Sequence, residues 1–120
     1  MKVITWSMGC GPRQSRYRIL IGGDFNAARR WDEVYHRKMC TKFVAEMNAA
    51  GFGEPHWDKY HREVQSFWGG RTQENYQDDH FFISKAWSKR VLSCNVIDNE
   101  VVRRLSDHGP IVLELDVGRG

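Results

Sequence analysis

The stretch at residues 17–26 restricts the fold of this chain more than any other. An apolar run at residues 17–21 ends at two glycines and is followed directly by Asp24-Phe25-Asn26. Consecutive β-favouring residues predict a strand that is covered on both faces, and the glycines allow a sharp turn at its end. Asp24 and Asn26 are two residues apart, so their side chains point the same way while Phe25 packs behind them. The strand therefore ends either in a chemical site or in a simple Asx-type turn.

The length of 120 residues predicts a single domain, residues 1–120, with one core. Hydrophobic residues make up 41% of the chain, which argues against disorder. The 18 basic and 15 acidic residues give a net charge of +3, which mildly favours a polyanionic partner. The three cysteines, Cys10, Cys40 and Cys94, are scattered, which argues for reduced thiols rather than a disulfide framework. No segment is typical of a signal peptide or a membrane span, so we expect a soluble, intracellular protein.

Residues 31–50 carry the clearest helical pattern. Cys40, Phe43, Val44 and Met47 recur at helical spacing, and Gly51 follows where a helix is expected to end. Residues 31–36 are interpreted as a separate short turn. The helix is expected to pack on the core.

Several short strands are predicted around this helix, at residues 2–6, 17–21, 64–68, 78–84, 91–97 and 111–117. Residues 52–60 are interpreted as a loop and residues 98–105 as a charged connector. His56 and His61, five apart, are interpreted as solvent-facing side chains rather than a metal pair. Short strands with one clear helix predict an α+β domain in which helix and sheet form layers.

Five arginines flank the ends of two predicted strands: Arg13, Arg16, Arg18, Arg29 and Arg30. Such a group forms either a solvated face or a phosphate-binding surface.

A second chemical motif, Ser106-Asp107-His108-Gly109-Pro110, directly precedes the last predicted strand. A carboxylate and an imidazole side by side at a strand start can contact two ends of one phosphate. On its own this motif does not distinguish a functional site from a chance occurrence of Asp-His.

Three motifs in this order resemble the endonuclease/exonuclease/phosphatase superfamily, which has the DNase I-like fold: Gly-Asp-Phe-Asn at residues 23–26, Asp-His-Phe-Phe-Ile-Ser at residues 79–84 and the motif at residues 106–110. The resemblance covers residues 1–10 and about 17–117. Ser7 stands where the family has Asn, and the long segment that carries the family's metal-ligand Glu is missing. The resemblance implies a truncated DNase I-like fold, a partial β-sandwich with a flanking helix.

The resemblance also implies a role for each matching residue. Asp24 would orient or deprotonate the attacking water, and Asn26 would donate its amide to a phosphoryl oxygen. Asp107 would help hold the metal, while His108, steered by Asp79, would stabilise the transition state. Substrate contacts are expected from Ser7, Arg29 and Arg30. The cofactor would be Mg²⁺ or Mn²⁺, weakly held because the family's Glu is missing, and Glu33, Glu54 and Glu74 are not expected to replace it.

Three hypotheses follow. The first is a metal-dependent phosphodiester hydrolase that acts on nucleic acid, with phosphoinositides and other phosphoesters as open alternatives. The second is a catalytically inactive remnant that binds nucleic acid or a protein. The third is a half-domain that completes its sandwich by pairing with itself or another chain.

Overall fold

A four-stranded antiparallel sheet forms the middle layer of the protein. The computed structural model describes residues 4–7, 18–70 and 75–118. The sheet has the strand order β1-β2-β4-β3. Its strands are β1 (Ile4–Ser7), β2 (Ile19–Asp24), β3 (Phe52–Gly53) and β4 (Asp79–Ser84).

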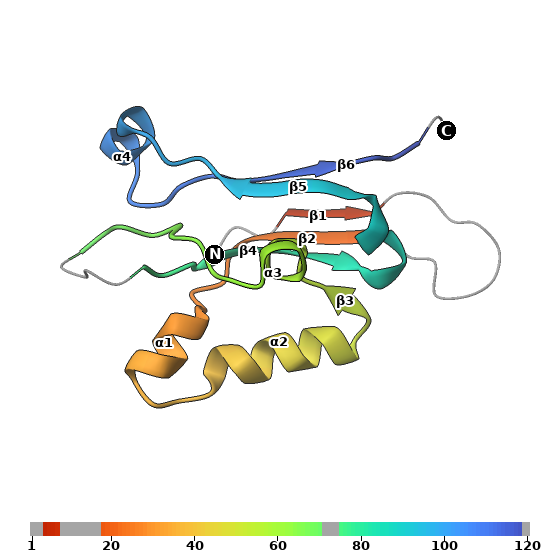
Figure 1. Ribbon diagram of the computed structural model, residues 1–120, viewed down its shortest axis with the longest axis horizontal. Coiled ribbons are helices and arrows are strands. Elements are labelled where there is room, and N and C mark those ends of the chain that lie inside the picture. The colour runs from red at the N-terminus through yellow and green to blue at the C-terminus, as the bar shows by residue number, and fades with distance from the viewer. Residues whose placement is uncertain (1–3, 8–17, 71–74, 119–120) are drawn as a thin grey trace.

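Two further layers cover the faces of this sheet (Figure 1). On one side lies a two-stranded antiparallel sheet of β5 (Val91–Val96) and β6 (Ile111–Leu115). On the other side lie helices α1 (Arg29–Val34) and α2 (Met39–Ala49). The predicted α+β class, with sheet and helix in layers, is confirmed.

Strand β2 runs through its glycine pair instead of turning there. Gly22 lies opposite Phe81 in β4, and a Cβ atom on Gly22 would come within 2.2 Å of the Phe81 ring. The glycine therefore makes room for an aromatic ring, and the strand continues to Asp24. The strand is covered on both faces, as predicted, although Gly22 is its only buried residue and the others are half-buried. Ile21 packs on the helix side, whereas Leu20 lines a cavity beneath the β5–β6 hairpin.

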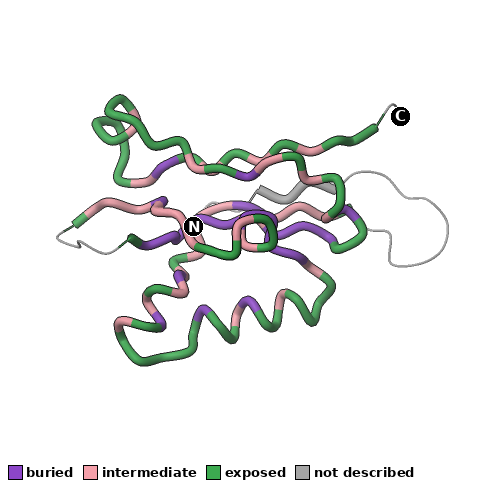
Figure 2. The backbone as a smooth tube through the Cα atoms, viewed as in Figure 1, coloured by how far each residue is buried: buried purple, intermediate pink, exposed green. Residues whose placement is uncertain are grey.

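Helix α2 packs against the sheet through the predicted stripe. Buried residues concentrate in the middle layer, while much of the outer elements is exposed (Figure 2). Cys40 and Val44 form the buried core with Phe82 of β4. The partly buried residues packed on this core are Ile21, Phe25, Ala27, Phe43, Met47 and Phe52. Gly51 follows the helix with φ +95°, as expected of a glycine that ends a helix.

Asp32 ties the two helices of this layer together. The side chain is buried in α1 and accepts hydrogen bonds from the backbone N–H of Cys40 (3.1 Å) and Thr41 (2.8 Å) and from Thr41 Oγ1 (2.8 Å). Burial alone would raise the pKa of this carboxyl, but the hydrogen bonds from Thr41 and Cys40 outweigh it and lower the pKa. Asp32 thus caps α2 from another helix.

Replacing Asp32 by alanine is expected to lower the free energy of unfolding by about 1–3 kcal/mol, because the α2 donors lose their buried acceptor. Urea unfolding measures the change. Because the folded pKa of Asp32 is lowered, its ionic contribution is complete above the ordinary value of 3.8 and is lost as the pH falls below it. Asp32→Asn, which keeps one acceptor oxygen, should therefore approach wild-type stability in acid. An equal deficit at all pH values would contradict this account.

Residues 52–60 form structure where a loop was predicted. Strand β3 is followed by helix α3 (Pro55–Tyr60), which packs against β4 and β5. Proline is favourable at the first helical turn, and Asp58 accepts a hydrogen bond from the backbone of Glu54. This helix buries His56, which is only 5% exposed, so the prediction of a solvent-facing His56 was wrong. His61 is exposed as predicted.

Two other segments differ from their predictions. Residues 64–68 form no strand; Phe67 makes only isolated bridges, to Tyr76 and to His108. The predicted connector at residues 98–105 contains helix α4 (Glu100–Leu105), because the Asn99 side chain caps it by accepting from Val102. Strands β4, β5 and β6 match the predictions, and β6 alternates half-buried and exposed residues.

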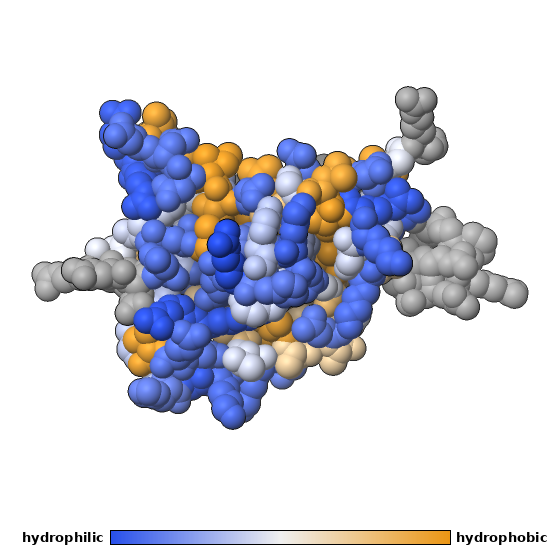
Figure 3. All heavy atoms as spheres, viewed as in Figure 1, coloured by the Kyte–Doolittle hydropathy of each residue, from blue (hydrophilic) through white to orange (hydrophobic). Residues whose placement is uncertain are grey.

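Apolar side chains reach the surface over the β5–β6 hairpin (Figure 3). The exposed large apolar residues on the hairpin, on α4 and beside them are Leu92, Ile97, Val101, Leu105, Val112 and Val117. Within the described residues, no helix is long and apolar enough to cross a membrane. Cys40 and Cys94 are buried free thiols, in line with the expected reduced state, whereas Cys10, Arg13, Arg16 and Glu74 lie outside the described residues.

Candidate active site

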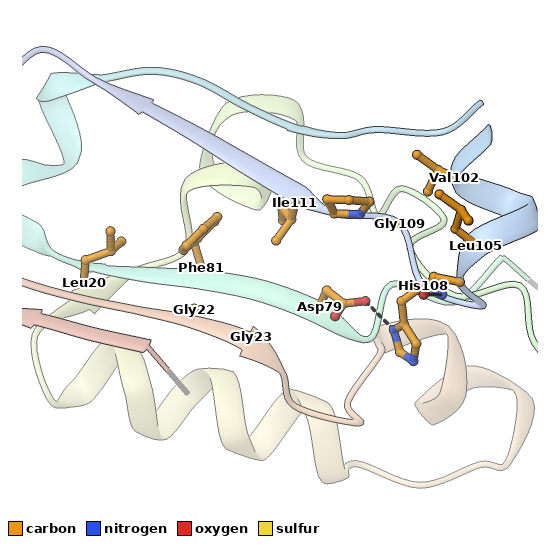
Figure 4. Close-up of a pocket in the computed structure, with 12 residues that line it drawn as sticks. Leu20, Gly22, Gly23, Asp79, Phe81, Val102, Leu105, His108, Gly109 and Ile111 are labelled. Carbon is orange, nitrogen blue, oxygen red and sulfur yellow. Dashed lines mark hydrogen bonds and ion pairs between the residues drawn. The ribbon is translucent and has the colours of Figure 1, made fainter. Parts of the chain in front are cut away.

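Three side chains meet where β2 ends and β4 begins: Asp24, Asp79 and His108. The β2–β4 register places Asp24 directly opposite Asp79. His108 Nδ1 lies 2.8 Å from Asp79 Oδ2, and His108 Nε2 lies 3.8 Å from Asp24 Oδ2. The side chains of Asp79 and His108 point toward one another at one end of the inter-sheet cavity (Figure 4). Two motifs that are 84 residues apart in the sequence thus contribute to one site.

The backbone of residues 66–68 anchors His108. The N–H of Gly109 donates to the Ser66 carbonyl (2.8 Å), and Phe67 forms a bridge with His108. The His108 ring lies against the Phe67 ring with 4.9 Å between centroids. The segment predicted to be a strand instead holds the histidine in place.

Ser66 fixes the carboxylate of Asp79. Its side chain is fully buried, and its hydroxyl donates to Asp79 Oδ2 (2.8 Å). The Ser66 Oγ atom also accepts from the backbone N–H of Asp78 (3.0 Å) and of Asp79 (3.1 Å). Sequence reasoning missed this role of Ser66, because a serine next to a Phe-Trp pair carries no signal of its own.

The pKa of His108 is raised above its ordinary value. Burial opposes the charged ring, but the hydrogen bond to Asp79 and the charges of Asp79, Asp24 and Asp107 outweigh burial and raise the pKa. With Nδ1–H donated to Asp79, Nε2 is the atom left on the side of Asp24. The site therefore favours a protonated, oriented imidazole.

The strand was predicted to end either in a chemical site or in an Asx-type turn, and the conformation of Asn26 bears on both. Its backbone N–H donates to Asp24 Oδ1 (2.8 Å), and its φ of +49° is a left-handed value that asparagine tolerates. The Asx-type turn is therefore present, and it orients the Asp24 carboxylate. The side chain of Asn26 is exposed.

Asp107 is not grouped with the three central side chains. Among the described residues, the donor atoms that lie within 4.8 Å of one another are those of Asp24, Asp79 and His108. The Asp107 carbonyl accepts from the backbone of Trp68 (2.9 Å), and its Oδ2 would lie 2.8 Å from a Cβ built on Gly69. Neighbouring side chains of extended backbone point apart. Asp107 thus lies outside this cluster, and its role as a metal ligand stays a prediction.

Ser7 lies in β1, away from the cluster. The antiparallel pairing of β1 with β2 places Ser7 opposite Ile19, at the start of β2, whereas Asp24 ends that strand. Five residues of strand separate the two ends, a distance of about 16 Å. The pairing therefore places Ser7 at the other end of β2 from the cluster, and its contact with a substrate stays a prediction.

Arg29 and Arg30 also have internal partners. Arg29 donates to both carboxylate oxygens of Glu54 (3.1 and 2.6 Å), and its guanidinium lies 3.7 Å from the centre of the Trp57 ring. Arg30 pairs at the surface with Glu33 (2.8 Å). Neither arginine joins the cluster, and Glu54 and Glu33 are engaged by these arginines.

Asp78 is a further acidic residue that sequence reasoning missed. It is 3% exposed, and its Oδ1 has no hydrogen-bond partner among the described residues. Burial, together with the negative charges of Asp24 and Asp79, raises the pKa of Asp78 to about 6. An uncompensated carboxylate thus lies immediately behind the cluster.

The substitution Asp78→Asn is expected to stabilise the protein by about 1–2 kcal/mol at neutral pH, because it removes a buried charge near two others. The pKa of Asp78 is raised in the folded state, so its ionisation costs stability as the pH rises from 3.8 to about 6. The gain measured by urea unfolding should therefore be present at pH 7.5 and vanish near pH 3.8. Destabilisation at pH 7.5 would show that the carboxylate has a partner that the amide cannot replace.

The cluster offers donors suited to a hard divalent cation. Asp24 and Asp79 supply carboxylate oxygens, and Asp78 adds negative charge that a cation would offset. Mg²⁺ or Mn²⁺ would be held by these two carboxylates and by water, with few protein ligands.

The fold and the cluster define a small α+β protein with a carboxylate–imidazole site. Searches find no match for this chain among protein-family models, curated proteins or solved structures.

Proposed function

We propose that this chain is a divalent-metal-dependent phosphodiester hydrolase. The observation that carries the proposal is the convergence of Asp24, Asp79 and His108 at one end of the sheet. The order of the three sequence motifs, with their resemblance to the endonuclease/exonuclease/phosphatase superfamily, adds support. The proposal includes a truncated DNase I-like domain, in which the β5–β6 hairpin corresponds to part of the second sheet of a sandwich.

The side chains have complementary tasks in such a reaction. His108, protonated and held by Asp79, donates from Nε2 to a nonbridging phosphoryl oxygen. Asp24, oriented by the Asn26 N–H, binds the attacking water and accepts its proton as the new P–O bond forms, while the bond to the leaving oxygen breaks and that oxygen takes a proton from solvent water. A bound Mg²⁺ or Mn²⁺ would neutralise charge on the phosphoryl group. Asn26 is exposed beside Asp24, so its carboxamide serves as a further donor to the phosphate.

Nucleic acid is the substrate class that we favour. The chain carries a net charge of +3, and Arg104 lies in the last turn of α4, shortly before His108, next to Arg103, which pairs with Asp98 (2.6 Å). Arg103 also lies over the Trp68 ring, 4.5 Å from its centre. Phosphoinositides and other phosphoesters share the chemistry that the cluster recognises. Buried free thiols support an intracellular location for the protein.

A specific observation supports the alternative of a half-domain. A cavity of about 630 Å³ lies between the two sheets, and apolar side chains such as Leu20, Phe81 and Ile111 line it. In a complete sandwich, interdigitated side chains would fill such a space. Pairing with a second chain would supply them, and a dimer that forms with rising concentration in size-exclusion runs would support this alternative.

Cleavage of supercoiled plasmid DNA tests the proposed function. The protein is incubated with Mg²⁺ or Mn²⁺, with a chelator as one control and the Asp24→Ala variant as the other. Nicking that depends on the metal and exceeds that of the variant supports the hydrolase. Binding of DNA without cleavage supports the inactive remnant, and cleavage no greater than that of Asp24→Ala rejects the hydrolase.

A further inference from the structure

A second pocket lies on the helix side of the loop that follows Asp24. Its volume is about 410 Å³, within the range of small-molecule sites. The post-β2 loop forms one wall, and helices α1 and α2 with their connection form the others. The side chains that the argument uses are those of Phe25, Asn26, Trp31, Arg37, Met39 and Phe43.

This pocket shares the post-β2 loop with the catalytic cluster. Asn26 lines the pocket, and its backbone N–H is bonded to Asp24 Oδ1 (2.8 Å). Asp24 in turn faces His108 across 3.8 Å. The cluster and the pocket therefore lie on the two sides of the loop at residues 25–28, joined through the contact between Asp24 and Asn26.

Aromatic rings line the pocket, and each packs against a neighbouring ring. Phe25 packs against Phe43 with 5.4 Å between ring centroids, and Trp31 packs against Tyr76 at 5.1 Å. The Arg37 guanidinium lies 5.2 Å from the centre of the Trp31 ring. Aromatic and guanidinium planes of this kind stack on planar heterocycles.

The charge and exposure of the remaining lining fit an uncharged, apolar guest. Burial raises the pKa of the Cys40 thiol to about 12, so it is neutral. The Asp32 carboxylate is occupied by the donors of α2. At the rim, Met39 is 67% exposed and offers apolar surface that a bound ring would cover.

We propose that this pocket binds a nucleobase of the substrate while the attached phosphate lies at the Asp24–His108 cluster. The placement beside the cluster rests on the proposed function. The base stacks within the aromatic lining, and the Arg37 guanidinium offers hydrogen bonds to its edge. The substrate class is thereby narrowed to nucleotides and nucleic acid, because the polar, non-planar ring of an inositol phosphate gains nothing from such walls.

The test measures binding of adenosine, which has no phosphate and therefore needs no catalysis. In ¹⁵N-labelled protein, the indole N–H resonance of Trp31 is assigned by its loss in Trp31→Phe. Adenosine is expected to shift this resonance, and ribose 5-phosphate is expected to leave it unchanged. An eight-residue oligothymidylate that binds more tightly than thymidine monophosphate would identify nucleic acid as the source of the base, and equal affinities would identify free nucleotides.

Two exposed apolar residues provide matched variants. Met39→Glu places a solvated charge on the rim and should weaken adenosine binding about fivefold. Leu92→Glu, at a residue of β5 that is 55% exposed, should leave binding unchanged. The proposal is overturned if adenosine does not shift the Trp31 resonance, or if both variants bind it equally well. Adenosine binding without plasmid cleavage would support the nucleobase pocket and reject the proposed hydrolase. Plasmid cleavage without adenosine binding would support the hydrolase and reject the nucleobase pocket.

Discussion

Replacing His108 by alanine is expected to reduce metal-dependent phosphodiester cleavage by at least about 100-fold, the usual range for a positioned acid or base. The ring lies between two carboxylates, 2.8 Å from Asp79 and 3.8 Å from Asp24, so its removal takes away the donor to the phosphoryl group. It also leaves the two carboxylates without the positive charge that separates them. His61→Ala, at an exposed histidine outside the cluster, is the matched control and should retain full activity.

The pH dependence of cleavage distinguishes a catalytic His108 from a merely structural one. Its pKa is raised, so the protonated form persists to higher pH than for an ordinary histidine, and activity should fall only above that raised pKa. Asp79→Asn removes the negative charge that raises the pKa of His108 and replaces the charged hydrogen-bond acceptor by a neutral amide oxygen. The alkaline limb of the rate profile should then move to lower pH. Unchanged cleavage by His108→Ala, or an unmoved limb in Asp79→Asn, would exclude this role.

Replacing Glu54 by glutamine is expected to destabilise the fold by about 3–5 kcal/mol, because it leaves two buried cations without their anion. Glu54 is 2% exposed and accepts two hydrogen bonds from Arg29. Its Oε1 atom also lies 2.9 Å from His80 Nδ1. His80 Nε2 lies 2.5 Å from the carbonyl oxygen of Ala27. Both partners of the His80 ring are acceptors, so both ring nitrogens donate and the ring is charged. A loss of this size is a large part of the stability of a small domain.

Urea unfolding measures this effect, and Glu33→Gln is the matched control. Glu33 pairs with Arg30 at the surface, where ion pairs contribute about 0–1 kcal/mol. A Glu54→Gln variant as stable as Glu33→Gln would contradict the proposed role of the buried network.

The same network sets a pH window for stability. Hydrogen bonds and charges from His80 and Arg29 outweigh the opposing effect of burial and lower the pKa of Glu54 to about 2, so its contribution is complete above 4.5 and is lost as the pH falls toward 2. For His80, burial opposes the charge, but Glu54 outweighs it and raises the pKa. Its contribution is complete below 6.5 and is lost as the pH rises through the raised value. The contribution of this network is therefore greatest between about pH 4.5 and 6.5.

The sequence predicted those parts of the fold in which local pattern and packing agree. The stripe of Cys40, Phe43, Val44 and Met47 specified the buried face of α2, and the alternation at residues 111–117 specified β6. The grouping of Asp24, Asp79 and His108 was also predicted, although by resemblance, since no local pattern brings residues 24 and 108 together.

The remaining features depend on contacts between distant residues. The position of Ser7 depends on the direction in which β1 pairs with β2, and four residues of strand sequence do not encode that direction. Arg29 was predicted to contact a phosphate. Its actual partner, Glu54, lies 25 residues away and could not be identified from the sequence. Ser66 and Asp78 acquired their roles only through burial against β4. Arg29, Ser66 and Asp78 are all polar, and the residues that surround them could not be identified before the tertiary fold was known.

The position of Asp24 opposite Asp79 makes the chemistry depend on the alignment of the β-ladder. Side chains directly across an antiparallel pair share a face, and a slip of one residue would turn one of the two acids to the reverse side of the sheet. Gly22 and Phe81, two positions along the same strands, fit tightly against each other and therefore help to keep the two acids opposite one another. Substitutions at this pair should shift the register of the two acids although neither residue belongs to the cluster.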